Sequence, residues 1–154
     1  METDFKKGFT LVELLVVVAI IVTIVSIVTS FLSSASMRSR DGRRKQNVDQ
    51  TVKAISLFFN ENGYLPLNET GWCTYISNPE SGYGAAFQLA ITPHMKLIQF
   101  DPTKAGQVGD YLYKNVDNIN GHFVFCANME VSTGNSYDHS SCLGGTTYNY
   151  CVIQ

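Results

Sequence analysis

Glu13 has the most unusual surroundings of any charged residue in the sequence, because it is the only ionisable side chain between Phe9 and Ser36. A carboxylate in so apolar a stretch is costly unless it meets a cation or reaches water. The first alternative is a glutamate at a membrane interface that reaches the polar layer or stays protonated. The second is a glutamate whose charge is compensated by a cation.

The four cysteines are candidates for disulfide bonds. An even number of cysteines in a small exported domain favours disulfides, and four cysteines allow three pairings. Zinc binding is the alternative, but no Cys-x-x-Cys pair is present, and His139 and Cys142 are the only close pair of potential ligands. The spacing therefore favours disulfides and predicts no metal site. The cysteines are Cys73, Cys126, Cys142 and Cys151.

No pattern typical of an enzyme active site occurs in the chain. The sequence lacks Gly-x-Ser-x-Gly, Gly-x-Gly-x-x-Gly, the Walker A motif and His-Glu-x-x-His. The histidines His94, His122 and His139 are isolated from one another in the sequence. Carboxylates without a pocket are not evidence of acid–base catalysis. We therefore expect no enzyme activity, no catalytic residue and no cofactor.

Charge is distributed very unevenly along the 154 residues, although the net charge is only −2. Residues 38–53 contain six basic and two acidic side chains, whereas residues 54–154 contain three lysines and eight acidic side chains. Residues 38–45, which carry five of these basic side chains, are called the basic collar below. The collar could be a solvated helix face, a contact for lipid head groups, or a partner for acidic regions of neighbouring chains. DNA binding is a weaker alternative, because the collar has no interleaved aromatic residues.

A single long helix is predicted for the first part of the chain. The apolar run from Phe9 to Val28 has about the 20 residues that a helix needs to cross a bilayer. Beyond it no proline and only one glycine occur before Gly63, and apolar side chains recur with helical spacing at Val48, Val52, Ile55 and Phe59. We expect a helix from about Thr10 to Asn60, apolar in its first half, amphipathic in its second half, and ended by Gly63.

The remaining residues predict a small α+β domain. Residues 71–100 are expected to form a loop with short helical segments, including an apolar helix at 83–91. Three strand-like runs follow, at 111–115, 122–130 and 146–153, and they predict a three-stranded antiparallel sheet packed on the second half of the long helix. Two cysteines fall on strands that could be neighbours, so the pair Cys126–Cys151 is favoured, which would leave Cys73 with Cys142.

The residues from Lys6 to Leu14, which read Lys-Lys-Gly-Phe-Thr-Leu-Val-Glu-Leu, resemble the class III signal sequence of the type IV pilin family. The resemblance implies that prepilin peptidase cleaves between Gly8 and Phe9 and that the new amine of Phe9 is methylated. It also implies that Glu13 pairs with the amine of Phe9 of a neighbouring subunit during assembly. An amine and a carboxylate that both lack water would satisfy each other in such a contact.

The family resemblance also implies the organisation of the whole chain. Residues 1–8 would be a leader peptide, 9–33 a transmembrane and filament-core helix, 34–62 the amphipathic half of that helix, and 63–154 a globular pilin head. The implied partners are identical or related pilin subunits, prepilin peptidase, an inner-membrane assembly platform and, before assembly, membrane lipid. Nucleic acid is not expected as a partner. Many family members carry a proline or glycine midway along the helix, and this chain does not.

The passage Asp101-Pro102 followed by Tyr111-x-Tyr113 resembles the head of the major pseudopilin of type II secretion. Those heads bind calcium through oxygens of a C-terminal loop. Here the aspartates are scattered, no EF-hand spacing is present and the usual acidic tail is missing, so no calcium site is predicted. The aspartates in question are Asp101, Asp110, Asp117 and Asp138.

The expected function is therefore that of a structural subunit of a type IV pilus or pseudopilus. The alternatives are a pseudopilin acting in type II protein export and a membrane-anchored extracytoplasmic binding module. The family resemblance implies a single-pass protein of the inner membrane with its head in the periplasm or outside the cell, and later in a filament. The cysteines agree with this orientation, whereas the basic collar after the apolar run favours the opposite one.

Overall fold

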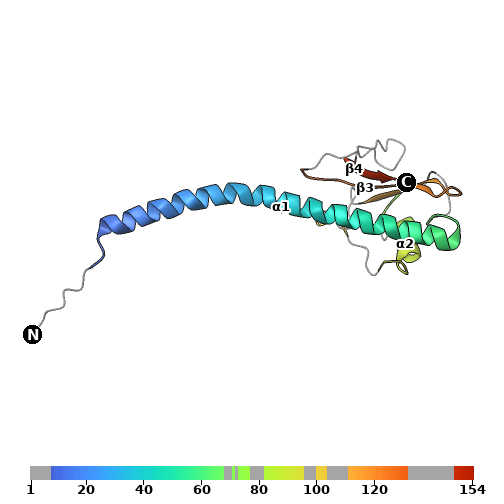
Figure 1. Ribbon diagram of the computed structural model, residues 1–154, viewed down its shortest axis with the longest axis horizontal. Coiled ribbons are helices and arrows are strands. Elements are labelled where there is room, and N and C mark those ends of the chain that lie inside the picture. The colour runs from blue at the N-terminus through green and yellow to red at the C-terminus, as the bar shows by residue number, and fades with distance from the viewer. Residues whose placement is uncertain are drawn as a thin grey trace, which may run out of the picture. The chain divides into compact units, whose positions relative to one another are not determined.

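The computed structural model combines one long helix with a small antiparallel sheet, so the predicted α+β class is confirmed. It describes residues 8–67, 71, 73–76, 82–95, 100–103, 111–131 and 148–154. The elements in chain order are α1 (Leu11–Asn62), β1 (Cys73–Tyr75), α2 (Gly82–Ile91), β2 (Leu112–Asp117), β3 (His122–Ala127) and β4 (Tyr150–Ile153) (Figure 1). The chain forms two compact units, Met1–Ser36 and Met37–Gln154, and the boundary between them falls inside α1.

The first unit contains the apolar part of α1. Within the described residues, α1 is the one helix long and apolar enough to cross a membrane, and its most apolar stretch is not buried. The hydroxyls in this part bond back to the helix. Thr23 Oγ1 donates to the carbonyl of Ile20 at 2.7 Å, and Ser26 Oγ donates to that of Val22 at 2.8 Å. These hydroxyls therefore need no water when the helix lies in an apolar environment.

The end of α1 is defined by Gly63, as the sequence predicts, and the last helical residue is Asn62, two residues beyond the expected Asn60. Gly63 has a φ of 74°, and its N–H donates to the carbonyl of Phe59 at 2.8 Å. This hydrogen bond closes the last turn of α1. The positive φ places Gly63 in the left-handed conformation, which glycine adopts at little cost.

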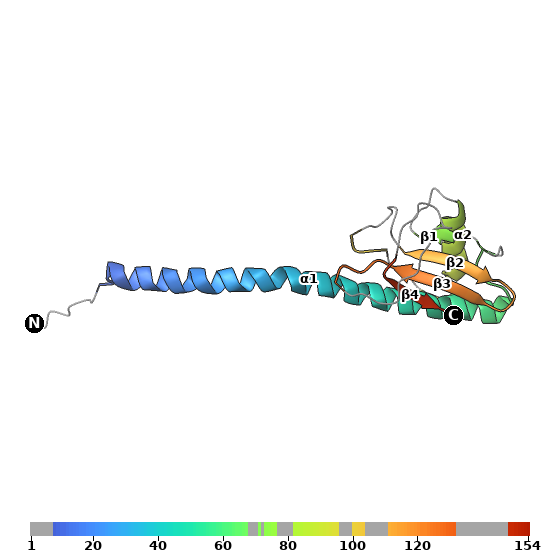
Figure 2. The same cartoon turned by 90° about the horizontal axis from the view of Figure 1, so that it is seen from above.

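The sheet has four strands among the described residues, in the order β1-β2-β3-β4, and every pairing is antiparallel (Figure 2). The prediction of three strands was wrong because β1 lies in the segment expected to be loop and short helices. β1 contains only three residues and pairs with β2, with Thr74 opposite Tyr113. A strand that short carries no measurable alternation of apolar and polar residues. The helix predicted at 83–91 is confirmed as α2.

The main core lies between α1 and one face of the sheet. The predicted helical stripe is buried at Val48, Val52 and Ile55, and Phe59 is partly buried beside it. Successive side chains of a strand alternate between faces, so Tyr113, Phe123 and Phe125 lie in this core, while Leu112, Val124 and Cys126 lie in a second cluster. Phe87 of α2 adds a ring whose centroid is 4.6 Å from that of Tyr113.

The second cluster contains a disulfide bond between β3 and β4. Cys126 and Cys151 lie directly opposite each other in the strand register and are bonded to each other. This is the pair that the predicted strands favour. Cys142 lies outside the described residues, so its pairing with Cys73 stays a prediction.

The turn between β2 and β3 requires glycine at Gly121, and we expect Gly121→Ala to lower the free energy of unfolding by about 1–3 kcal/mol. Gly121 has a φ of 72°, and an added Cβ would lie 2.8 Å from the ring of Phe59. Denaturant unfolding of the detergent-solubilised chain, followed by near-ultraviolet circular dichroism, measures the change.

The matched control for this substitution is Gly42→Ala, because Gly42 lies inside α1 with nothing within 4 Å of an added Cβ. That variant should gain roughly 0.4–1 kcal/mol from the lower entropy of the unfolded chain. Equal stabilities for Gly121→Ala and the unsubstituted protein would contradict the predicted clash with Phe59.

Candidate functional site

The bond between Gly8 and Phe9 lies in exposed backbone without regular structure, three residues before α1 begins at Leu11. Phe9 is 84% exposed, and nothing lies within 4 Å of where a Cβ of Gly8 would be. An exposed peptide bond outside regular secondary structure is the kind that proteases cleave most readily. Lys6 and Lys7, which belong to the same motif, lie outside the described residues.

Glu13 and Thr10 cap the start of α1 through reciprocal hydrogen bonds. The Thr10 N–H and hydroxyl donate to Oε2 of Glu13 at 2.9 and 2.8 Å, and the Glu13 N–H donates to Thr10 Oγ1 at 3.3 Å. This is a capping box, in which an N-cap threonine and a glutamate three residues later satisfy each other's backbone N–H. Glu13 lies in the first turn, where the helix dipole also favours a negative charge.

The cap leaves part of the Glu13 carboxylate available. Both bonds from Thr10 end on Oε2, and no described residue donates to Oε1. An ionised carboxylate can accept about four hydrogen bonds. An amine from a second chain could therefore bond to Glu13 without breaking the cap, so capping and pairing are compatible roles for this residue.

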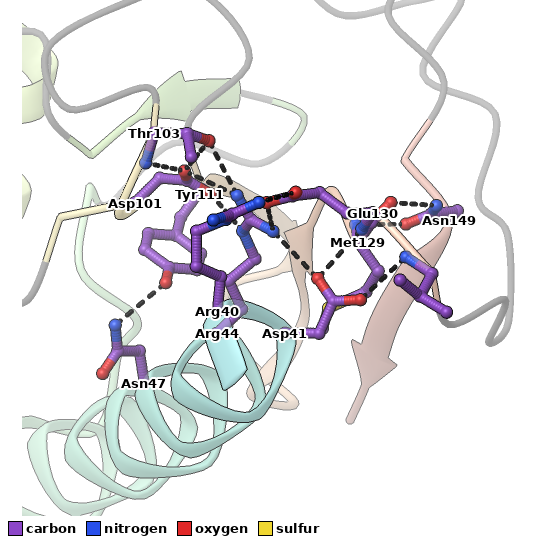
Figure 3. A network of polar contacts seen from close by, with 11 residues as sticks. Arg40, Asp41, Arg44, Asn47, Asp101, Thr103, Tyr111, Met129, Glu130 and Asn149 are labelled. Atoms are coloured by element: carbon purple, nitrogen blue, oxygen red, sulfur yellow. Dashed lines mark hydrogen bonds and ion pairs between the residues drawn. The ribbon is translucent and has the colours of Figure 1, made fainter. Parts of the chain in front are cut away.

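A polar cluster, called the internal cluster below, lies in the basic collar and is centred on Arg44, which is 1% exposed (Figure 3). Its guanidinium donates to both oxygens of Asp101, from Nε at 2.6 Å and from Nη2 at 3.0 Å. Nη1 donates at 2.8 Å to Asp41 and at 2.8 Å to Glu130, while Nη2 also donates to the hydroxyl of Thr103 at 2.7 Å. The planar guanidinium of an arginine suits such a bidentate contact with a carboxylate.

Asp41 and Arg40 extend this cluster to the segment that follows β3. The carboxylate of Asp41 accepts hydrogen bonds from the backbone N–H groups of Glu130 at 2.9 Å and Val131 at 2.8 Å. Arg40 binds the carboxylate of Glu130 through Nε at 2.8 Å and through Nη2. The cluster therefore fastens residues 100–103 and 129–131 to α1.

The interpretation of the collar as a solvated helix face was wrong for Arg44, which is buried, and Arg40 is only partly exposed. Both bind carboxylates of their own chain, because the folded unit brings Asp101 and Glu130 onto the helix. Arg38 and Arg43 remain exposed. Lys45 is partly buried, with its Nζ 5.5 Å from the centroid of the Tyr150 ring. The collar thus divides into an internal part and an exposed part.

Charge pairing in the cluster shifts the pKa values of Glu130, Asp101 and Arg44 toward their ionised forms. The hydrogen bond from Arg40, assisted by Arg44, outweighs desolvation and lowers the pKa of Glu130 to about 2. Burial by itself would raise the pKa of Asp101, but the hydrogen bonds from Arg44 and Thr103 outweigh it and lower the value. Burial likewise disfavours the charged form of Arg44, yet its carboxylate partners raise its pKa overall.

These shifts predict that the folded unit loses stability in acid. The pKa of Glu130 falls from its ordinary 4.5 to about 2 on folding, so the unfolded chain binds more protons in this window. The contribution is therefore complete above pH 4.5 and is lost as the pH falls toward 2. The denaturant concentration at the midpoint of unfolding should therefore fall as the pH is lowered from 4.5 to about 2. It should fall less in the Glu130→Gln variant, which has no carboxylate at this position. A midpoint that stays constant throughout the window would contradict the lowered pKa.

The Asp-Pro and Tyr-x-Tyr passage serves the fold in this structure. Asp101 binds Arg44, the hydroxyl of Tyr111 accepts a hydrogen bond from Asn47 at 2.9 Å, and the buried hydroxyl of Tyr113 donates to the carbonyl of Pro66 at 2.9 Å. Asp117 accepts hydrogen bonds within the β2–β3 turn. The described part of the chain contains no cluster of three potential metal ligands. Asp110 and Asp138 lie outside it.

Comparison with known families gives one match, to the model of the prokaryotic N-terminal methylation motif, over residues 5–32. No curated protein and no solved structure matches the chain. The matched residues include Gly8, Phe9 and Glu13, and they supply most of the apolar part of α1. The match therefore supports a type IV pilin-like family, and together with the apolar helix it fits a single-pass, membrane-anchored protein.

Proposed function

We propose that the chain is the precursor of a structural subunit of a type IV pilus or pseudopilus. Prepilin peptidase would remove residues 1–8, and the subunit would polymerise through the N-terminal part of α1. The observation that carries this proposal is the methylation motif at 5–32, which contains the accessible Gly8–Phe9 bond and the lone charge of Glu13. In this proposal the protein acts as a building block and not as an enzyme.

The exposed apolar surface of α1 supports polymerisation. Side chains along its first half, such as Leu15 at 61% and Val22 at 58%, have no described partner that covers them. Apolar surface is stable in lipid, or buried against other apolar surface at a gain of about 25 cal/mol per Å² relative to water. The helix would therefore lie in the inner membrane before assembly and pack against other copies afterwards.

Cleavage would supply the cation that Glu13 lacks. Removing residues 1–8 creates an amine on Phe9, and the free oxygen of the Glu13 carboxylate would accept a hydrogen bond from the amine of a neighbouring subunit. The inner-membrane assembly platform would bring the two subunits together. We further propose that the head lies outside the inner membrane, where the Cys126–Cys151 disulfide would persist.

Within this class we favour a secretion pseudopilus over a surface pilus. The support is the Asp101-Pro102 and Tyr111-x-Tyr113 passage, which resembles the major pseudopilin and has a defined structural role in this head. Deleting the gene should then abolish export of secreted proteins and leave surface motility and adhesion unchanged. The reverse phenotype would assign the subunit to a pilus.

Mass spectrometry of the protein extracted from membranes tests the proposed processing. The expected product begins at Phe9 and carries one added methyl group. In a strain that lacks prepilin peptidase, the same measurement should find residues 1–8 still attached. An intact leader in a strain that contains the peptidase would instead indicate a membrane-anchored binding module and would overturn the proposed function.

A further inference from the structure

A groove with a volume of about 450 Å³ lies between α1 and the segment that begins at Phe100, inside the folded unit 37–154. One wall is formed by side chains of α1 with helical spacing, and the other by the two residues that flank Asp101. The lining residues are Arg43, Gln46, Asn47, Gln50, Phe100 and Pro102.

The internal cluster holds one wall of this groove in place. Phe100 and Pro102 flank Asp101, whose carboxylate is bound by the buried guanidinium of Arg44 and by the N–H and hydroxyl of Thr103. Asn47 is fixed as well, because its side chain donates to the hydroxyl of Tyr111. A partner that enters the groove therefore meets a surface that is already ordered, which lowers the entropic cost of binding.

The groove presents one cation, several amides and an aromatic ring to solvent. Arg43 is exposed, and no described residue forms an ion pair or hydrogen bond with it, in contrast to Arg40 and Arg44. Phe100 is 47% exposed. An accessible arginine beside an aromatic ring is a combination enriched at protein–protein contacts, and the arginine selects a partner that carries a carboxylate.

We propose that this groove receives an acidic side chain from the head of a second copy of the same chain. Charge complementarity supports this partner, because residues 54–154 still carry six acidic side chains against three lysines when Asp101 and Glu130, which bind arginines of their own chain, are set aside. Arg43 remains on the outside of a helix whose neighbouring arginines are already neutralised internally. The inference rests on the proposed function, since only a filament brings many copies into the repeated contact that makes a weak surface pair effective.

Charge reversal in the full-length chain tests the groove. Arg43→Glu should lower filament yield about fivefold or more, because one attraction is lost and one repulsion is added. Gln50→Glu introduces a negative charge into the same groove without changing Arg43 and should act in the same direction. The matched control is Lys53→Glu, which makes the same charge change at an exposed position of α1 outside the groove and should leave the yield within about twofold.

A photo-crosslinking residue in place of Gln46 identifies the partner, with the same residue in place of Lys53 as control. The expected product is a dimer of this chain from the Gln46 position, strongly reduced by Arg43→Glu. Crosslinking to a different protein, or equal effects of Arg43→Glu and Lys53→Glu, would overturn the groove proposal and leave the filament function standing. Correct folding of each variant is checked by its near-ultraviolet circular dichroism. Absence of filaments and of leader cleavage in the unsubstituted protein would overturn the proposed function itself.

Discussion

Replacing Arg44 with methionine should lower the free energy of unfolding of the folded unit by about 3–5 kcal/mol, which is the usual cost of removing one partner from a buried ion pair. Arg44 is 1% exposed and binds Asp41, Asp101 and Glu130. Methionine fills much of the same volume, so the loss comes chiefly from two buried carboxylates that are left without a cation. Denaturant unfolding of the detergent-solubilised full-length chain measures it.

The matched control is Arg38→Met, because Arg38 is an exposed arginine of the same collar and makes no ion pair with a described residue. Its effect should stay within about 0.5 kcal/mol. A double-mutant cycle isolates the central contact. Asp101→Asn should cost less in the Arg44→Met background than in the unsubstituted protein, with a coupling of roughly 1–3 kcal/mol. Additive effects of the two substitutions would contradict a direct contribution of the Arg44–Asp101 pair.

Local signals explain why the sequence predicts the helices well. The end of α1 depends on a single glycine that adopts a positive φ, and the buried face depends on the spacing of Val48, Val52 and Ile55. Both features lie within a few residues of the structure that they determine. The three-residue strand β1 differs, because its pairing with β2 joins segments about 40 residues apart and its own pattern is too short to read.

The buried polar cluster could have been anticipated in part. Extending the stripe of Val48 backward by four and seven residues gives Arg44 and Asp41, so helical periodicity alone places both on the buried face. The charge composition of the collar does not reveal this difference, because it counts the exposed Arg43 and the adjacent buried Arg44 alike. The partners could not be predicted, since Asp101 and Glu130 lie 57 and 86 residues away along the chain. Only the folded sheet brings them to the helix.

The amino-terminal cap was also present as a signal in the sequence. Thr10 and Glu13 have the threonine-x-x-glutamate spacing of a capping box directly before an apolar run. The unusual charge of Glu13 points to a partner in another chain, and the structure adds a partner in the same chain. Glu13 therefore combines a local role with the proposed assembly role, and the two can be separated by experiment.

Glu13→Gln and Glu13→Ala should both abolish filaments, if pairing with the Phe9 amine of a neighbouring subunit is the essential function. Glutamine preserves the capping box, because its side-chain oxygen can still accept from Thr10. It cannot supply the negative charge that an amine in an apolar surrounding requires. Electron microscopy of sheared filaments, together with the amount of processed subunit in the membrane, measures the outcome.

Thr10→Ala provides the complementary control, because it removes the hydroxyl partner and leaves the Glu13 carboxylate in place. Filaments should persist in this variant, since the helix loses one cap while the charge that meets the amine is retained. Filaments in Glu13→Gln together with their loss in Thr10→Ala would show that capping α1, rather than pairing with an amine, is what assembly requires of Glu13. The opposite pattern would assign the carboxylate to the contact between subunits, because glutamine keeps one oxygen for the cap and lacks the negative charge and second acceptor oxygen that the amine would meet.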